Sequence, residues 1–402
     1  MPILTASIPL TNPIKAPEKS AIAQASVFER LVGRLGELVL KYPKYVFAVG
    51  LLLVFFGLAG LYKITVDVNV ASFFKPGTEF RDSMDFMDQE MTGTMDLRIR
   101  VEGDIKDPSI LRKMDSLQLF VENNNKIAVT YSIADVVKQM HRTVMDDSLK
   151  YESIPTSREK VNNLFTMYSM SGDPEDFSAM IDYDYTVGLI TALSTVMTTE
   201  EVFSFVVSIS NYMTNYFSEN LNIDVTGMIV VIRDMVILII QSSSLSILFS
   251  LILIGIIASI FFKRILWGFL AVIPLTAAVI LNFGLMGHFN VSLNHITAIL
   301  SAIIIGVGVD FAIHFISQFQ RLSQTVHEGQ LSREVIKDVG YPIILDAGSN
   351  MGFGALLFSA FVPVQYIGGL MVFAMISTSM GTLPLLSSTS ELLKHRLIER
   401  EN

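Results

Sequence analysis

Long runs without charged residues dominate this chain and predict several membrane spans. The four longest runs lacking Asp, Glu, Lys and Arg contain 18, 28, 45 and 44 residues. A helix needs about 20 apolar residues to cross the hydrocarbon core of a bilayer, so the longer runs hold more than one span. We expect six spans, at Tyr45–Tyr62, Ser243–Phe262, Leu266–Leu285, Ile296–Phe319, Pro342–Phe361 and Tyr366–Leu386.

Two short polar segments divide the longest runs. Gly287–Asn290 separates the third span from the fourth, because glycine and asparagine favour turns. Val362–Gln365, which contains Pro363, separates the fifth span from the sixth. A proline here also fits a kink within one longer helix.

Residues 65–228 show a different pattern, in which strand-like and helix-like segments alternate. The expected strands are Val66–Phe74, Met95–Val101, Ile127–Ile133, Tyr185–Leu193 and Ile223–Thr226. The expected helices are Asp107–Asn124, Ser157–Met170 and Thr199–Phe217, the last opened by the capping sequence Thr198–Glu201. Two βαβ groups of this size predict a ferredoxin-like fold made of split βαβ units.

The fold class is therefore an α-helical polytopic membrane protein with one α+β ferredoxin-like domain. We expect five parts, which are a flexible cytoplasmic tail (1–24), an interfacial helix with the first span (25–64), an extracytoplasmic porter domain (65–228), the remaining spans (229–390) and a cytoplasmic tail (391–402). The interfacial helix is expected because apolar residues recur at helical intervals from Val27 to Leu40.

A continuous helix is expected from Met228 to Phe262, about 50 Å long. Such a helix would extend the second span into the outer domain and couple the two parts. The Arg233–Asp234 pair on this helix is expected either to take part in that coupling or to form a surface ion pair alone.

Composition and charge support a membrane protein and set its orientation. Hydrophobic residues make up 51% of the chain and charged residues only 17%, which excludes a soluble enzyme or a DNA-binding protein. The absence of cysteine excludes disulfides and cysteine-type zinc sites. Residues 65–228 hold 26 acidic and 13 basic groups, so the outer domain carries the excess negative charge.

The basic residues near the spans place both termini in the cytoplasm. They fall before the first span, between the second and third, between the fourth and fifth, and after the sixth: Lys15, Lys19, Arg30, Arg34, Lys41, Lys44, Lys263, Arg264, Arg321, Arg333, Lys337, Lys394, Arg396 and Arg400. The domain over 65–228 then lies outside the cytoplasm.

Asp310 is the candidate functional residue of the fourth span. It stands 11 residues before Arg321, about 16 Å along a helix, which places it near the bilayer centre. A charged side chain there costs about 2.5–3.5 kcal/mol on insertion scales. We therefore expect Asp310 to carry protons, the alternative being a structural carboxylate tied to a neighbouring helix.

Neighbouring residues in the fourth span complete this candidate site. Gly306 and Gly308 would let another helix approach and bury Asp310, or would serve helix packing alone. His314 lies one turn after Asp310 on the same face. It would share the proton or hold the carboxylate, or it is purely structural.

The fifth span adds further candidates for a proton relay. Ser349 and Asn350 are expected to hydrogen-bond Asp310 across the helix interface, or else to join helices. Asp346 lies nearer the cytoplasm and is either a relay residue or a hydrated interfacial group.

The order of spans and these motifs resemble the RND superfamily, and within it the MMPL or hydrophobe-amphiphile efflux exporters related to Patched. The resemblance lies in one span, an outer domain and five further spans, in the GxxxD pattern from Gly306 to Asp310, in Ser349–Phe353 and in Thr226–Gly227. It covers roughly residues 40–390. It implies a proton-driven exporter of lipids or other amphiphiles in the bacterial inner membrane.

Members of this superfamily usually have twelve spans, so the resemblance implies a half-size member that works as a homodimer. It implies no cofactor other than the coupling proton, no enzymatic activity and no nucleic-acid partner. The expected partners are a lipid-like substrate, the membrane and a periplasmic adaptor or carrier. A SecD/SecF-like translocation subunit is the alternative, although Phe311–His314 follows Asp310 where SecD-like spans differ. A sterol-sensing-like scaffold without transport is a third reading.

Overall fold

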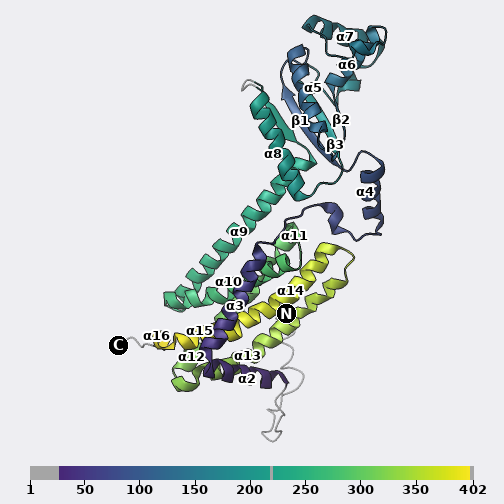
Figure 1. The fold of residues 1–402 in the computed structure, drawn as a ribbon. Helices are drawn as coiled ribbons and strands as arrows, with labels where there is room; N and C mark the ends of the chain where they lie inside the picture. The colour runs from purple at the N-terminus through teal and green to yellow at the C-terminus, as the bar shows by residue number, and fades with distance from the viewer. Residues whose placement is uncertain (1–26, 218–220, 399–402) are drawn as a thin grey trace, which may run out of the picture.

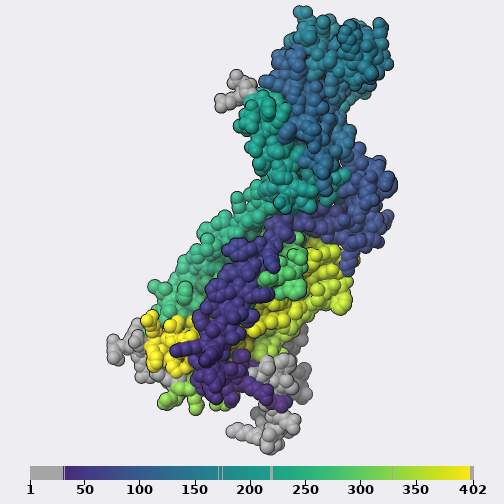
Figure 2. All heavy atoms as spheres, viewed as in Figure 1, coloured from purple at the N-terminus to yellow at the C-terminus, as the bar shows by residue number. Residues whose placement is uncertain are grey.

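A computed structural model describes residues 27–217 and 221–398. The tail expected over 1–24 and the end of the C-terminal tail, 399–402, lie outside the described residues. The molecule is elongated, with a helical bundle at one end and an α/β domain at the other (Figures 1 and 2). One long helix, α9 (Met228–Phe261), connects the two.

Apolar helices form the bundle. Within the described residues, five helical stretches are long and apolar enough to cross a membrane: Pro43–Leu61 (α3), Met228–Phe261 (α9), Ile265–His288 (α10), His295–Ser323 (α11 and α12) and Val362–Leu392 (α14, η7 and α15). The amphipathic helix α2 (Val27–Lys41) precedes them and packs along α13. The short helix α16 (Lys394–Ile398) follows them.

The remaining expected span, Pro342–Phe361, has a different structure. α13 (Leu331–Asn350) begins well before it with a charged turn, which lowers its mean hydropathy. After Asn350 the chain tightens into the 3₁₀-helix η6 (Met351–Phe358). This segment is not among the five apolar stretches, so the count of six spans stays a prediction.

The expected break at Val362–Gln365 is misplaced. The chain breaks earlier, at Ser359–Phe361, and α14 (Val362–Met380) already includes Pro363 in its first turn. Proline is well tolerated there because the first N–H groups of a helix have no helical partner. Pro363 thus marks the start of a helix rather than a break before it.

The outer domain contains one four-stranded sheet. Its elements are α4 (Glu79–Glu90), β1 (Met95–Glu102), α5 (Pro108–Glu122), β2 (Ile127–Ser132), α6 (Ile133–Val144), α7 (Arg158–Ser171), β3 (Val187–Ser194), α8 (Thr199–Tyr216) and β4 (Ile223–Thr226). The strand order is β2-β3-β1-β4 with antiparallel neighbours, the arrangement of a split βαβ unit.

Alternating burial along β1 explains how the sheet packs. Leu97, Ile99 and Val101 are fully buried and share a core with apolar residues of α5 and α8, while Arg98 between them is exposed. The alternation follows from the two-residue period of a strand. Two helices, α4 and α6, were not expected from the sequence, although a capping box between Ser132 and Asp135 opens α6.

The strand expected at Val66–Phe74 is wrong. This segment makes isolated bridges from Val66 to Leu293 and from Phe74 to Phe361, and in between it forms the 3₁₀-helix η2 (Val70–Phe73). Asn69 caps η2 by accepting a hydrogen bond from the Ala71 amide, so local capping replaces strand pairing. The segment ties the outer domain to the bundle through Phe73 and Phe74, which pack on Phe361.

Glycines let α3 and α10 approach at backbone distance. A Cβ built on Gly60 would lie 2.1 Å from the carbonyl oxygen of Gly284, and one on Gly284 would lie 2.3 Å from that of Gly57. A side chain at either position would force the helices apart. This is the small-residue packing by which membrane helices associate closely.

We predict that Gly284→Ala destabilises the bundle by about 1–3 kcal/mol, as overpacking does in a close interface. Fluorescence of Trp267, the only tryptophan in the sequence and one that is buried against Phe319, can follow thermal unfolding in detergent. Gly348→Ala is the control, because a Cβ there meets nothing within 4 Å. A Gly284→Ala variant at least as stable as the parent would contradict the close packing.

An ion pair attaches α7 to the end of β1. The Arg158 guanidinium donates to Asp104 at 2.5 Å, and this bond, with a further one from the Lys106 amide, lowers the pKa of the Asp104 carboxyl. A lowered pKa in the folded state means that the pair stabilises the fold above the ordinary pKa, near 4, and loses this effect as pH falls through the lowered value.

We therefore predict that Asp104→Asn speeds hydrogen exchange of α7 amides at neutral pH. The expected change is about fivefold at most, since an exposed ion pair contributes little. As pH is lowered below about 4, the difference between variant and parent should vanish because the parent carboxyl becomes protonated. A difference independent of pH would exclude the ion pair as the cause.

Candidate functional site: a polar groove between α12 and α13

Helix α12 (Leu300–Ser323) has a buried apolar face and an exposed face that carries the polar residues. Ala312 and Phe315 are fully buried in the bundle. Gly306, Asp310 and His314, spaced four residues apart, are exposed on the other face. Residues four apart are neighbours on a helix surface, so Asp310 and His314 form one polar stripe.

Helix α13 carries a second stripe with the same spacing. Asp338, Pro342, Asp346 and Asn350 follow one another at intervals of four. At the C-terminal end of this stripe, the Asn350 side-chain amide donates to Asp346 at 3.5 Å.

The two stripes face one groove of about 520 Å³. Its lining contains polar and apolar residues: Asp310, Phe311, His314, Gln318, Arg321, Asp338, Val339, Pro342, Ile343 and Asp346. At one end the Gln318 side-chain amide donates to Asp338 at 2.6 Å, and Arg321 lies 3.9 Å from the same carboxylate. This end of the groove is therefore closed by hydrogen bonding, while the part around Asp310 is open.

Asp310 and His314 are unpaired within the groove. Within residues 27–217 and 221–398, neither side chain makes a hydrogen bond or an ion pair. A carboxylate and an imidazole one turn apart, both accessible, can exchange protons with each other or with a molecule that enters the groove. No group of three or more His, Asp or Glu side chains in the described chain could hold a metal ion.

The two glycines before Asp310 occupy different surroundings. A Cβ on Gly308 would lie 2.5 Å from Leu275 and 3.3 Å from Thr378, so Gly308 packs against α10 and α14 inside the bundle. A Cβ on Gly306 would meet nothing within 4 Å. Within one chain, neither glycine brings a helix over Asp310.

The two polar residues expected to bond Asp310 from the fifth span do not reach it in the described chain. Asn350 bonds Asp346 on its own helix. Ser349 faces a different cavity, shared with Met375 and Ser379 of α14. The groove thus brings together Asp310, His314 and Asp346 but not Ser349.

Sequence reasoning missed Gln318 and Asp338 as parts of this groove. Gln318 continues the four-residue spacing from Asp310 and His314, and Asp338 begins the spacing that leads to Asp346. The periodicity was a usable signal, but the pairing of the two stripes depends on how α12 and α13 pack.

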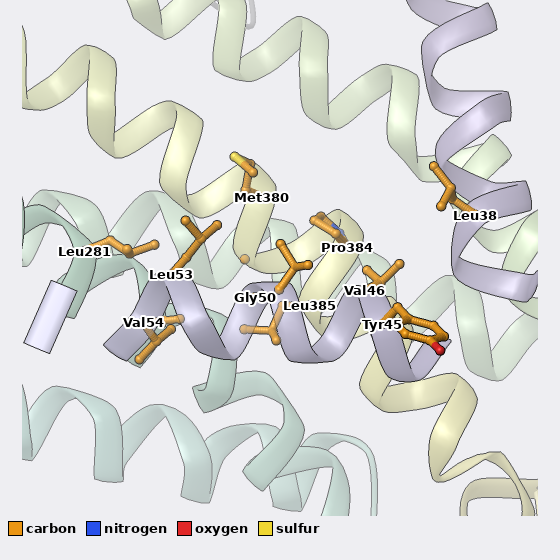
Figure 3. A pocket seen from close by; sticks show the side chains of 13 residues that line it. Leu38, Tyr45, Val46, Gly50, Leu53, Val54, Leu281, Met380, Pro384 and Leu385 are labelled. Carbon is orange, nitrogen blue, oxygen red and sulfur yellow. The ribbon is translucent and has the colours of Figure 1, made fainter. Parts of the chain in front are cut away.

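Apolar cavities lie on other faces of the bundle, and two of them flank α14. One, of about 240 Å³, lies where α3 packs near the end of α14, and Figure 3 shows Val46, Gly50 and Leu53 on one side and Met380 and Pro384 on the other. The second, of about 680 Å³, lies between α2, α13 and α14 and is the cavity that Ser349 faces. Their linings are almost entirely apolar, so both suit hydrocarbon rather than water.

Comparison with protein-family models identifies the chain. Residues 108–387 match the MMPL family, so the chain belongs to the MMPL family, within the RND superfamily. The match includes most of the outer domain, α12 and α13. Comparison with curated protein sequences finds no match.

A solved structure has a similar fold. It is the cryo-EM structure of the hedgehog release protein Disp from the water bear Hypsibius dujardini, with a TM-score of 0.64 and 12% sequence identity. The similarity covers 91% of this chain but 50% of the Disp chain, so the chain spans half the length of that protein. At this identity the likeness establishes the fold alone.

Proposed function

We propose that this protein is an RND-type exporter of lipids or other hydrophobic molecules, driven by the proton-motive force, with Asp310 as the proton carrier. The observation that carries the proposal is an unpaired carboxylate, the one acidic residue of α12, in the middle of this spanning helix. Such a residue is costly without a function, and intramembrane carboxylates typically serve ion or proton pathways. His314, one turn away, is placed to accept or return the proton.

The exposure of Asp310 supports a homodimer. A charged group facing lipid costs several kcal/mol, so the groove needs a cover within the membrane. This chain matches 50% of the Disp chain, and a second copy of it would take the place of the unmatched part. Two copies related by an axis normal to the membrane would bring two grooves together and enclose both carboxylates.

Helix α9 supports coupling between proton transfer and the outer domain. Ile229 and Val230 belong to the core of the outer domain, whereas Val236 and Ile239 belong to the core of the bundle. The helix follows β4 directly at Gly227, and the Met228 amide donates to the Asp96 carboxylate of β1 at 3.0 Å. Because no flexible linker intervenes, a tilt of α9 in the membrane would move the sheet.

The nature of the cargo follows from the cavities and the family. Both cavities that flank α14 are lined by aliphatic and aromatic side chains, which favours hydrophobic ligands. With the termini in the cytoplasm, the acidic outer domain would be the periplasmic porter part of an inner-membrane protein and would pass cargo to a carrier. The MMPL match favours this exporter reading over a SecD/SecF-like subunit.

We predict that Asp310→Asn abolishes proton-dependent efflux while the protein stays folded. The amide keeps the size of the carboxyl but cannot carry a proton, and Asp310→Glu should retain part of the activity. Efflux of a hydrophobic fluorescent dye from cells lacking other exporters measures the effect. Asp184→Asn, in an exposed turn of the outer domain, is the control expected to behave as the parent. Proton-dependent efflux by Asp310→Asn at the parent rate would refute the proposal.

The proposed homodimer can be tested separately by disulfide cross-linking, because the sequence has no native cysteine that would form other disulfides. With His314→Cys, oxidation in the membrane should give a disulfide-linked dimer on a denaturing gel, because the two grooves face each other. Ile256→Cys, on the outer surface of α9 and 51% exposed, should remain monomeric. Equal cross-linking at both positions, or none at His314→Cys, would argue against this dimer face.

A further inference from the structure

The last spanning segment contains an unusual concentration of buried hydroxyl groups. It runs through α14, the π-helix η7 (Gly381–Leu386) and α15 (Ser387–Leu392). Seven of its hydroxyl side chains are buried, and Ser379 is half-buried: Ser377, Thr378, Thr382, Ser387, Ser388, Thr389 and Ser390 are the buried ones. A bilayer offers no water to these groups from outside, so each needs a partner within the protein.

Five of these hydroxyls have the usual partner, a carbonyl one turn earlier in the same helix. Thr378 donates to Ala374, and Ser388 and Thr389 both donate to Leu385. Ser377 and Ser379 bond in the same way. Such back-bonding is the common solution for serine and threonine in membrane helices.

Three hydroxyls and one amide oxygen in this region have no partner. The unpartnered atoms are Thr382 Oγ1, Ser387 Oγ, Ser390 Oγ and, on α10, Asn282 Oδ1, and all four residues are at most 1% exposed. Among the described residues, only one other buried side-chain polar atom, in the outer domain, lacks a partner. A buried polar atom without a hydrogen bond is destabilising, so three such hydroxyls and one amide oxygen in the same region call for a common explanation.

The backbone of the same region has gaps in its hydrogen-bond ladder. Pro384 within η7 and Pro274 within α10 have no N–H, so each removes one donor from its helix. The two helices meet here, since a Cβ on Gly381 would lie 3.0 Å from the Pro274 carbonyl oxygen. Carbonyl and hydroxyl oxygens therefore gather in one interior region.

The π-helix aligns the unpartnered hydroxyls. A π-turn closes an i→i+5 hydrogen bond, so Thr382 and Ser387, five residues apart, lie one above the other. Ser390 follows one α-turn later, and the three span about 12 Å along the helix. Next in sequence is Glu391, which accepts hydrogen bonds from Ser332 and from Lys394, whose side chain is 21% exposed.

We propose that these oxygens hold an internal file of ordered water molecules, which runs from Glu391 at the cytoplasmic end toward Asn282. Water is the ligand that fits, because each orphaned hydroxyl needs a donor or an acceptor and water supplies both. The hydroxyls are neutral, which disfavours a bound metal cation. Ordered water in a bundle is expected where a helix ladder is broken inside the protein.

The role of this file in proton transfer rests on the proposed function. The file gives protons a route from the cytoplasm into the bundle. Its upper part lies beside α12, since the Thr378 methyl carbon would be 3.3 Å from a Cβ built on Gly308, two residues before Asp310. The groove of Asp310 lies on the opposite, exposed face of α12. The file would therefore bring protons to the inner side of α12, across this helix from the Asp310 groove.

Stability measurements on matched variants decide whether the file exists. In a dry interior, Thr382→Val and Ser387→Ala would remove an unsatisfied hydroxyl and raise Tm. In a hydrated interior, the same changes leave a water molecule without one of its hydrogen-bond partners, and we expect Tm to fall by about 1–3 °C. Thr389→Val and Ser388→Ala are the controls, because their hydroxyls are already bonded to Leu385, and we expect smaller shifts from both. A rise in Tm for Thr382→Val and Ser387→Ala would overturn the water file.

Proton uptake into vesicles tests the route. With a pH-sensitive dye inside and an imposed potential, Thr382→Val should slow uptake at least about threefold, whereas Thr389→Val should match the parent. Unchanged uptake in Thr382→Val would overturn the proton route. If the parent itself takes up no protons, both the proposed function and the route fail, and the stability series still decides whether water is present.

Discussion

The exclusion of water from the bilayer is the constraint on which this structure depends. Every polar group in the bundle must find a partner inside the protein, because lipid offers none. Most hydroxyls of the last span meet this requirement by bonding their own helix. Among the described residues, Asp310 and His314 in the groove and the orphaned hydroxyls around η7 have no such partner. A second copy would cover the first set, and water would satisfy the second.

Helix α9 links the bundle to the sheet domain. Its lower part belongs to the bundle core and its upper part to the core of the sheet domain. The contact between Gly227 and β1, where a Cβ would lie 2.7 Å from the Asp96 carbonyl oxygen, fixes the angle at which the helix leaves the sheet. Within the bundle, the glycines of α3 and α10 let the backbones of these two helices come into contact. In the proposed mechanism, a change in helix packing would reach the sheet domain through α9.

Much of the architecture could be predicted from periodicity and composition. The helix α9, the strands β1–β4 and the cap of α8 at Thr198 and Glu201 appear close to their expected places, because their signals are local. The errors have local causes too. Val66–Phe74 alternates like a strand but has no strand to pair with, and Pro363 begins a helix instead of breaking one. The helix η6 and the π-helix η7 have no clear signature in sequence.

The sequence by itself determined that this is a membrane protein with an acidic domain over residues 65–228 and a costly carboxylate, Asp310, in the middle of a span. Burial energies and helix periods depend on residue type and spacing, which the sequence states directly. Only the tertiary structure decided which polar residues share a site. In the structure Asp346 shares a groove with Asp310, whereas Ser349 faces another cavity. The hydroxyls of Thr382, Ser387 and Ser390 have no hydrogen-bond partners. These outcomes depend on how neighbouring helices pack and on the π-turn that shifts one face of the last span, and neither is encoded in local periodicity.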